Sequence, residues 1–256
     1  MERSARSRRM RRVGWILTAL VLCLIVGCWI YLATYYRALP EALETIREPA
    51  QSVTVTRLDG DRLVFAPEDP VAGLIFYPGG KVQYEAYAPL MEACAERGVL
   101  CILVRMPGNL AVLAPNAADG LQALYPAVTD WYLAGHSLGG VMAASYAAKH
   151  PGAYRGLVLL AAYSTADLSE SGLHVLSLVG TEDGVLDREK AEAAAENLPP
   201  DAALLELEGG CHAYFGCYGP QRGDGTPTIS NQAQIRQTAD AIAELVAAAA
   251  AKPSAA

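Results

Sequence analysis

Charged residues are scarce in this chain of 256 amino acids. They make up 18% of the sequence, whereas hydrophobic residues make up 52%, and acidic side chains outnumber basic ones to give a net charge of −7 at pH 7. An acidic chain is a poor candidate for nucleic-acid binding, which depends on clustered basic residues. The sequence also lacks internal repeats, so its length fits one α/β domain of about 200 residues with an appendage.

Metal-binding side chains are equally sparse. Among six cysteines and four histidines, only Cys211, His212 and Cys217 cluster in the sequence, and no second group completes the four ligands of a zinc site. We therefore expect no bound metal. A disulfide between Cys211 and Cys217 stays open as an alternative, because it would close a short loop around His212. A pairing of Cys94 with Cys101 is also open if the domain lies in an oxidising compartment.

One long hydrophobic run stands near the N-terminus. Residues 13–33 are uncharged and, at the helical rise, span roughly 30 Å, about the thickness of the hydrocarbon core of a bilayer. Aromatic residues up to Tyr36 suit the interfacial belt of a membrane, so we predict a transmembrane anchor over 13–36 and a stalk over 37–50. Six arginines precede the run: Arg3, Arg6, Arg8, Arg9, Arg11 and Arg12.

The arginines predict a single-pass protein of the cell membrane. By the positive-inside rule, residues 1–12 stay in the cytoplasm and the domain after the anchor is extracytoplasmic. A cleaved signal peptide is the main alternative, although its hydrophobic region usually has only about 7–15 residues. The sequence Ile-Val-Gly-Cys at 25–28 also resembles a bacterial lipoprotein processing site, but it lies inside the hydrophobic run rather than at its end.

Beyond the predicted stalk, the hydrophobic pattern indicates an α/β domain over 51–250, followed by a low-complexity tail at 251–256. Two alternating segments around a Leu-Asp-Gly-Asp turn predict a β-hairpin. Apolar strands then alternate with helices, which is typical of a mostly parallel sheet covered on both faces. The expected strands are 53–57, 62–66, 73–77, 99–104, 130–133, 156–160, 174–178 and 202–207, and the expected helices are 41–47, 84–97, 117–125, 141–149, 188–197 and 231–250.

A Gly-His-Ser-Leu-Gly motif at 135–139 joins one apolar strand to a helix of small residues. This context is what a nucleophile elbow requires, because the glycines allow a sharp turn that holds Ser137 in a strained conformation. An ordinary turn is the alternative. Only about a dozen residues separate the strands at 156–160 and 174–178, so we expect a minimal lid and an open site.

If Ser137 is a nucleophile, it needs a base, because an isolated hydroxyl is almost fully protonated at neutral pH. His212 is the best placed histidine, since it lies in a Gly-Gly-Cys-His loop between the last predicted strand and the last helix. The other three histidines, at positions 136, 150 and 174, have structural interpretations. The order of serine, acid and histidine along the chain is then that of an α/β-hydrolase.

The acid should follow a strand that lies between these two residues. Asp183 is in a turn just past the strand at 174–178, where its carboxylate would accept the imidazole N–H and fix the tautomer. Glu182 and Asp187 compete for this role, but Asp187 is more typical of a helix N-cap.

Two backbone N–H groups are expected to form an oxyanion hole. One belongs to Leu138, the residue after the nucleophile, and the other to the loop after the strand at 73–77. That loop contains two glycines, and we choose Gly80, with Lys81 as the next candidate. Lys81 could also attract an anionic substrate group, and Asn109 is a candidate pocket residue because it follows another strand end. Plain structural roles are the alternatives for both.

Five short blocks resemble the signature motifs of the α/β-hydrolase superfamily, specifically of the dienelactone-hydrolase-like group of small, often membrane-anchored bacterial members. The resemblance covers roughly residues 50–250, and it is specific because the blocks recur in one order. They are 77–82 (YPGGKV), 106–111 (MPGNLA), 135–140 (GHSLGG), 180–184 (GTEDG) and 209–216 (GGCHAYFG).

The resemblance implies an α/β-hydrolase fold with Ser137, Asp183 and His212 as the catalytic triad, and it implies no particular substrate. Members of the group tend to have asparagine before the histidine and a residue other than cysteine at the position of Cys217. The two departures together favour the disulfide between Cys211 and Cys217, and they leave the triad intact.

We therefore expect a membrane-anchored serine hydrolase that cleaves an ester, a lactone or a related acyl bond through an acyl-enzyme, without a metal or an organic cofactor. Its partners would be a small acyl substrate and the membrane. Cleavage of a thioester or an amide with the same residues is one alternative. A catalytically silent binding module on a hydrolase scaffold is another, because a fold does not determine a function.

Overall fold

The computed structural model describes residues 2–251, with side chains from residue 14 onward. The side chains of the predicted basic segment at 1–12, and the predicted tail at 251–256 beyond its first residue, lie outside the described part. The chain divides into two compact units, Met1–Tyr35 and Tyr36–Ala256.

The first unit is a single helix, α1 (Glu2–Ala33). Its segment Gly14–Ala33, of 20 residues, is long and apolar enough to cross a membrane, and its side chains are exposed. A signal sequence near an N-terminus can meet the same criteria of length and composition. The helix could therefore be a membrane anchor or a signal sequence.

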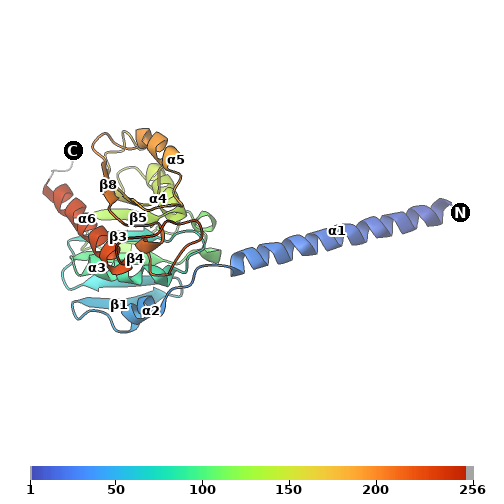
Figure 1. The fold of residues 1–256 in the computed structure, drawn as a ribbon, viewed down its shortest axis with the longest axis horizontal. Helices are drawn as coiled ribbons and strands as arrows, with labels where there is room; N and C mark the ends of the chain where they lie inside the picture. Colours follow the sequence, from blue (N-terminus) through green and yellow to red (C-terminus); the bar gives the residue numbers. More distant parts are fainter. Residues whose placement is uncertain (1, 252–256) are drawn as a thin grey trace. The chain divides into compact units, whose positions relative to one another are not determined.

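The second unit is built on an eight-stranded sheet in the order β1-β2-β4-β3-β5-β6-β7-β8 (Figure 1). The first two strands form the predicted antiparallel hairpin, β2 pairs antiparallel with β4, and every other pairing is parallel. The predicted mostly parallel sheet is thus confirmed. The strands are β1 (Val53–Asp59), β2 (Arg62–Pro67), β3 (Ala72–Tyr77), β4 (Val99–Val104), β5 (Trp131–His136), β6 (Gly156–Leu160), β7 (His174–Gly180) and β8 (Ala203–Leu207).

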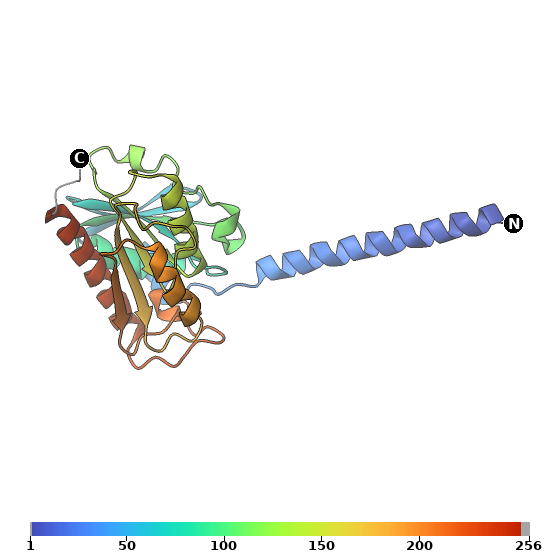
Figure 2. The same ribbon diagram turned by 90° about the horizontal axis from the view of Figure 1, so that it is seen from above.

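Helices cover both faces of this sheet (Figures 1 and 2). The central strands are buried on both faces, and alternate side chains enter two separate cores. In β3, for example, Leu74 and Phe76 belong to one core, whereas Ile75 and Tyr77 belong to the other. One face carries α3 (Ala88–Ala95) and α6 (Asn231–Ala251), and the other carries α4 (Leu138–Lys149) and α5 (Arg188–Ala193).

The helix predicted at 84–97 is shorter than expected. It begins as a 3₁₀ turn, η1 (Tyr84–Tyr87), and becomes α-helical only at α3. Pro89 sits in the first turn of α3, where its missing N–H leaves no hydrogen bond unmade. Gly98 follows the helix with a φ of 87°, a left-handed conformation that directs the chain into β4.

The helix predicted at 117–125 is wrong. Gly120 has a φ of 72° in the middle of the segment, which interrupts any helix, and only η4 (Gln122–Leu124) is helical there. The helix predicted at 188–197 is α-helical only over α5 and continues as a 3₁₀ turn, η5 (Ala194–Asn197).

Tyr36 attaches the start of the second unit to the loop after β3. Its N–H donates to the Lys81 carbonyl at 2.8 Å, and its carbonyl accepts the N–H of Gln83 at 2.9 Å, so that Tyr36 and Val82 form an isolated parallel bridge. The Tyr36 ring also packs on Tyr218, with 5.6 Å between centroids. The chain is therefore fixed to this loop from its first residue in the unit.

The predicted stalk at 37–50 packs on the domain rather than standing free of it. Its helix α2 (Pro40–Arg47) lies against α3 and buries Ala42 completely. The N–H of Leu39 donates to the Cys217 carbonyl at 3.0 Å. The segment is thus an integral part of the second unit.

A chain that begins at Tyr36 should therefore fold intact, whereas a chain that begins at Gln51 should be less stable because it loses α2. We expect its Tm, measured by circular dichroism, to fall by about 5–10 °C, which corresponds to about 2–3 kcal/mol. In the longer chain, Ala42→Arg should reproduce much of this loss, and the exposed Glu44→Arg should not. Equal Tm values for the two chains would show that 37–50 contributes no stability.

Candidate active site

Ser137 lies at the sharp turn between β5 and α4. Its backbone has φ 50° and ψ −124°, a conformation that strains any residue with a side chain. Its N–H donates to the carbonyl of Leu160, at the end of β6, at 2.9 Å. The predicted succession of strand, tight turn and helix around this serine is confirmed.

Two glycines make this turn possible because they remove side chains from close backbone contacts. A Cβ on Gly135 would lie 2.5 Å from the carbonyl carbon of Gly139. A Cβ on Gly139 would overlap the carbonyl oxygens of Tyr77 and Pro78. The elbow is therefore pressed directly against the loop that follows β3.

His212 and Asp183 form a buried pair. His212 Nδ1 lies 2.9 Å from Asp183 Oδ2, and the two side chains are 2% and 0% exposed. Asp183 Oδ1 accepts the N–H groups of Val185 and Leu186, both at 2.8 Å. Burial alone would raise the pKa of Asp183, but the hydrogen bond and charge of His212 and the two backbone donors outweigh it and lower that pKa. Asp183 is thus a carboxylate at neutral pH and accepts the Nδ1–H of His212.

With its Nδ1 proton directed at Asp183, His212 presents Nε2 as a hydrogen-bond acceptor. This atom is buried and has no hydrogen-bond partner among residues 14–251, Ser137 Oγ included. Catalytic hydrogen bonds are often long until the substrate binds. Ser137 directly follows His136, whose ring centroid lies 4.6 Å from that of His212. Ser137, Asp183 and His212 also follow the C-terminal ends of the parallel strands β5, β7 and β8, so they lie at the same edge of the sheet.

The competing carboxylates are engaged elsewhere. Glu182 Oε1 accepts the hydroxyl of Thr181 at 3.4 Å. Asp187 caps α5 by accepting the N–H of Lys190 at 3.2 Å, as its sequence position predicts. His212 Nδ1 is bonded to Asp183 and not to either of them.

The loop after β3 leaves one N–H available beside the elbow. The N–H of Lys81 donates to the Asn109 carbonyl at 2.7 Å, and the N–H just before Gly80 donates to the Tyr87 hydroxyl at 3.0 Å. Gly80 N–H has no partner within the described residues. A Cβ on Gly80 would lie 3.0 Å from Leu138 Cδ2, so the two predicted oxyanion donors are neighbours. Gly80 is therefore the better candidate, and Asn109 acts on this loop through its main chain.

Asp224 organises the site although the sequence analysis did not single it out. Its carboxylate accepts the N–H groups of His212 at 3.1 Å, Ala213 at 2.8 Å and Gly184 at 3.2 Å. The Asp224 side chain thus joins the loop that contains His212 to the turn that follows β7. The Gly-Asp-Gly sequence at 223–225 indicates only a turn, and no spacing could have pointed to these partners.

The predicted disulfide between Cys211 and Cys217 is not formed, and all six cysteines are free thiols. The two side chains face different partners, because the Cys211 thiol lies against the Asp224 carboxylate and Cys217 lies near α2. Burial, with the Asp224 charge, raises the pKa of Cys211 to about 12. The open pairing of Cys94 with Cys101 is also not formed, although both thiols are buried.

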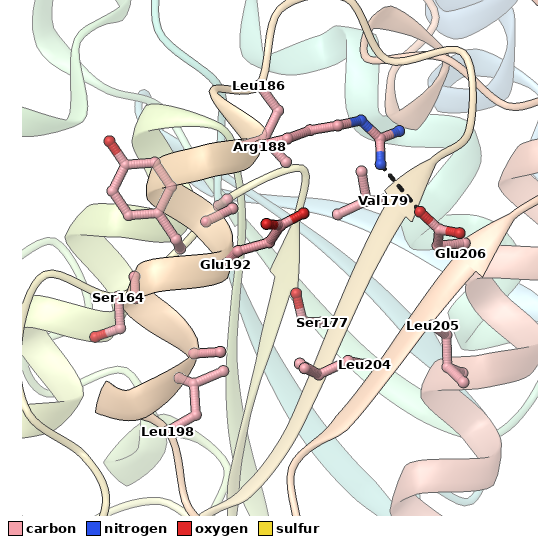
Figure 3. A pocket seen from close by; sticks show the side chains of 15 residues that line it. Ser164, Ser177, Val179, Leu186, Arg188, Glu192, Leu198, Leu204, Leu205 and Glu206 are labelled. Atoms are coloured by element: carbon pink, nitrogen blue, oxygen red, sulfur yellow. Dashed lines mark hydrogen bonds and ion pairs between the residues drawn. The ribbon is translucent and has the colours of Figure 1, made fainter.

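A cavity of about 310 Å³ lies between α5 and the strands β7 and β8 (Figure 3). Apolar side chains line much of it, including Leu186, Leu198 and Leu204. Arg188 and Glu206 bond to each other at 3.0 Å at one side of it. None of the three predicted catalytic residues lines this cavity.

Comparisons with known proteins agree with this architecture. A sequence model described as the alpha/beta hydrolase family matches residues 73–236. A search of curated proteins finds no match.

Solved structures with the same fold come from several organisms. TT1662 from Thermus thermophilus has 18% identity and a TM-score of 0.57, over 76% of this chain and 98% of that chain. Est1E from Butyrivibrio proteoclasticus has 17% identity and a TM-score of 0.55, over 79% and 100%. A monoacylglycerol lipase from Paleococcus ferrophilus has 17% identity and a TM-score of 0.55, over 77% and 99%. Because the family match spans more than half of its length, this chain belongs to the alpha/beta hydrolase family.

Proposed function

We propose that this chain is a serine hydrolase that cleaves an ester, a lactone or a related acyl bond. The observation that carries the proposal is the buried pair of His212 and Asp183, which orients an imidazole whose Nε2 acceptor has no partner in the described residues. A buried polar atom without a partner costs free energy, so its retention beside a strained serine points to chemistry. The lipase among the similar structures supports this class by analogy.

In the proposed reaction, Ser137 Oγ attacks the acyl carbonyl carbon while His212 Nε2 takes the hydroxyl proton. Asp183 stabilises the resulting imidazolium, and the carbonyl oxygen, now negative, accepts the N–H groups of Gly80 and Leu138. The bond to the leaving oxygen then breaks, and His212 returns the proton to that oxygen. Water attacks the acyl-enzyme by the same route and releases the acid. These steps use no metal or organic cofactor.

We place the substrate entrance above the elbow and expect it to be open. Residues 161–173, which connect β6 to β7, contain neither helix nor strand, and this supports a minimal lid. Lys81 is half-buried in the proposed oxyanion loop, where its ammonium could meet an anionic substrate group.

We further propose that α1 anchors the domain in the cell membrane, with residues 1–12 in the cytoplasm and the hydrolase domain outside. The 20 apolar residues of Gly14–Ala33 support this, since they match the thickness of a bilayer. The arginines before them support the orientation.

Fluorophosphonate labelling tests the nucleophile. The wild type should be labelled at Ser137 and should hydrolyse a short p-nitrophenyl ester, whereas Ser137→Ala should escape labelling and lose at least about 10⁴-fold in kcat. Ser145→Ala, on the same helix, should behave as the wild type. An absence of labelling in the folded wild type would exclude a serine hydrolase. Matched ester, lactone, thioester and amide substrates would then rank the bonds it cleaves.

Two neighbouring carboxylates allow a matched test of the acid. Asp183→Asn should lower kcat by about 10⁴-fold because the amide holds the wrong imidazole tautomer, and Glu182→Gln should not. Since the pKa of Asp183 is lowered in the folded state, its contribution to stability should be present above the ordinary value of about 3.9 and lost as the pH falls through the folded value. Tm measured against pH should show this loss in the wild type and not in Asp183→Asn. The reverse ranking of the two variants would assign the acid to Glu182.

The anchor is tested by fractionation. The full chain should sediment with membranes and resist carbonate extraction, and a chain that begins at Tyr36 should stay in the supernatant. Protease added to the outside of intact cells should cleave within 51–250. A mature protein without residues 1–33, identified by mass spectrometry, would instead show that the helix is a cleaved signal sequence.

A further inference from the structure

A buried tyrosine and a buried histidine connect the two sides of the candidate site. Tyr87, at the end of η1, and His136, the residue before Ser137, are both excluded from solvent. Tyr87 Oη lies 3.0 Å from the nitrogen of Gly79 and 2.7 Å from His136 Nδ1. The proposed reaction gives neither side chain a role, yet both contact groups beside the proposed nucleophile and the oxyanion loop.

The direction of each hydrogen bond follows from the chemistry of the groups. Gly79 N–H can only donate, so Tyr87 Oη accepts there. If Oη also accepted from His136, the phenol proton would be buried without a partner, so we infer that Tyr87 donates it to His136 Nδ1. Burial raises the pKa of Tyr87 and keeps the phenol protonated. Burial, followed by the charge of His212, lowers the pKa of His136 and keeps that imidazole neutral. A neutral His136 that accepts at Nδ1 carries its proton at Nε2.

His136, at one end of this chain of hydrogen bonds, packs against His212, the proposed base. The ring centroids of His136 and His212 lie 4.6 Å apart, with 53° between the ring planes. His136 Nε2 is buried and makes no hydrogen bond within the described residues. An uncharged His136 avoids repulsion when His212 becomes an imidazolium.

The close packing of these groups leaves no room for a side chain at position 79. A Cβ on Gly79 would lie 2.6 Å from His136 Nδ1 and 2.7 Å from Tyr87 Oη. The N–H of Cys217 donates to the carbonyl of Ala86 at 2.7 Å, so the residue before Tyr87 holds the loop that carries the base. Tyr87 is thus joined to both loops, through its hydroxyl to one and through the adjacent main chain to the other.

We propose that Tyr87 and His136 are positioning residues that hold the oxyanion loop at a fixed place relative to the base. Tyr87 binds the N–H of Gly79 and so restrains the peptide between Pro78 and Gly79. The next peptide carries Gly80 N–H, and its carbonyl, that of Gly79, accepts the N–H of Val82 at 3.3 Å. Together these bonds hold the loop while Gly80 N–H is left for the substrate. This inference rests on the proposed serine hydrolase function. Neither side chain touches the substrate, so the effect acts through Gly80 and His212.

The hydrogen bonds that join Gly79, Tyr87 and His136 are called the relay below. Tyr87→Phe removes the hydroxyl at its centre. We expect kcat to fall about tenfold to hundredfold while KM changes less than about twofold, because the loss falls on the oxyanion and not on ground-state binding. A trifluoromethyl ketone, which forms a tetrahedral oxyanion on the serine, should lose affinity by the same factor.

Tyr132→Phe is the matched control, because Tyr132 Oη is equally buried and has no hydrogen-bond partner within the described residues. It should retain the kcat of the wild type. Equal kcat values for Tyr87→Phe and Tyr132→Phe would overturn the proposal.

Two substitutions of His136 test the acceptor. His136→Asn can keep an oxygen near the position of Nδ1 and should retain most of the activity, whereas His136→Leu should resemble Tyr87→Phe. Thermal unfolding of each variant reports whether it folds. If both variants fold and have equal activities, the role of the His136 acceptor is overturned. If His136→Leu does not fold, a loss of activity in folded His136→Asn overturns it instead.

The imidazole ¹⁵N spectrum of the wild type tests the relay without turnover. His136 should remain the neutral Nε2–H tautomer between about pH 5 and 8, and Tyr87→Phe should shift its Nδ1 signal. A His136 that titrates in this range, or that carries its proton at Nδ1, would overturn the relay whatever the activity. An absence of fluorophosphonate labelling with this tautomer in place would contradict the proposed function and leave the relay supported.

Discussion

The close approach of two backbone segments at the elbow is the constraint on which the rest of the site depends. Gly139 lies so near the carbonyl of Tyr77 that no side chain fits between them, and a Cβ on Gly140 would lie 2.5 Å from that of Ala162. This contact fixes α4 against the ends of β3 and β6. The unusual backbone of Ser137 persists because the packing on both sides determines it.

Polar side chains hold the loops that this contact does not reach. Asp224 joins the loop of His212 to the turn after β7, and Tyr87 joins the loop after β3 to the elbow. Asp224 binds backbone N–H groups on both sides, whereas Tyr87 binds one backbone N–H and one side chain, that of His136. Two buried or half-buried polar side chains thus hold the loops of the site, mostly through backbone N–H groups.

Site residues can be predicted from the sequence where they belong to short contiguous motifs. The elbow around Ser137 and the histidine loop at His212 are short contiguous motifs placed after recognisable strands, so the periodic pattern of the sheet locates them. Tyr87 and Asp224 are different, because their partners lie far along the chain and no spacing marks them. Local patterns also mislead. The apolar pattern at 117–125 conceals the left-handed Gly120, and the two cysteines of the histidine loop are near in sequence although their thiols contact different groups.

Tyr36 gives the N-terminal helix a mechanical connection to the catalytic domain. It is the first residue of the second unit, and its hydrogen bonds to Lys81 and Gln83 form an isolated bridge rather than a strand of the sheet. A pull on the N-terminal segment would therefore load these two bonds before any ladder of the sheet. The loop that contains Gly80 is thus the first part of the second unit to bear such tension.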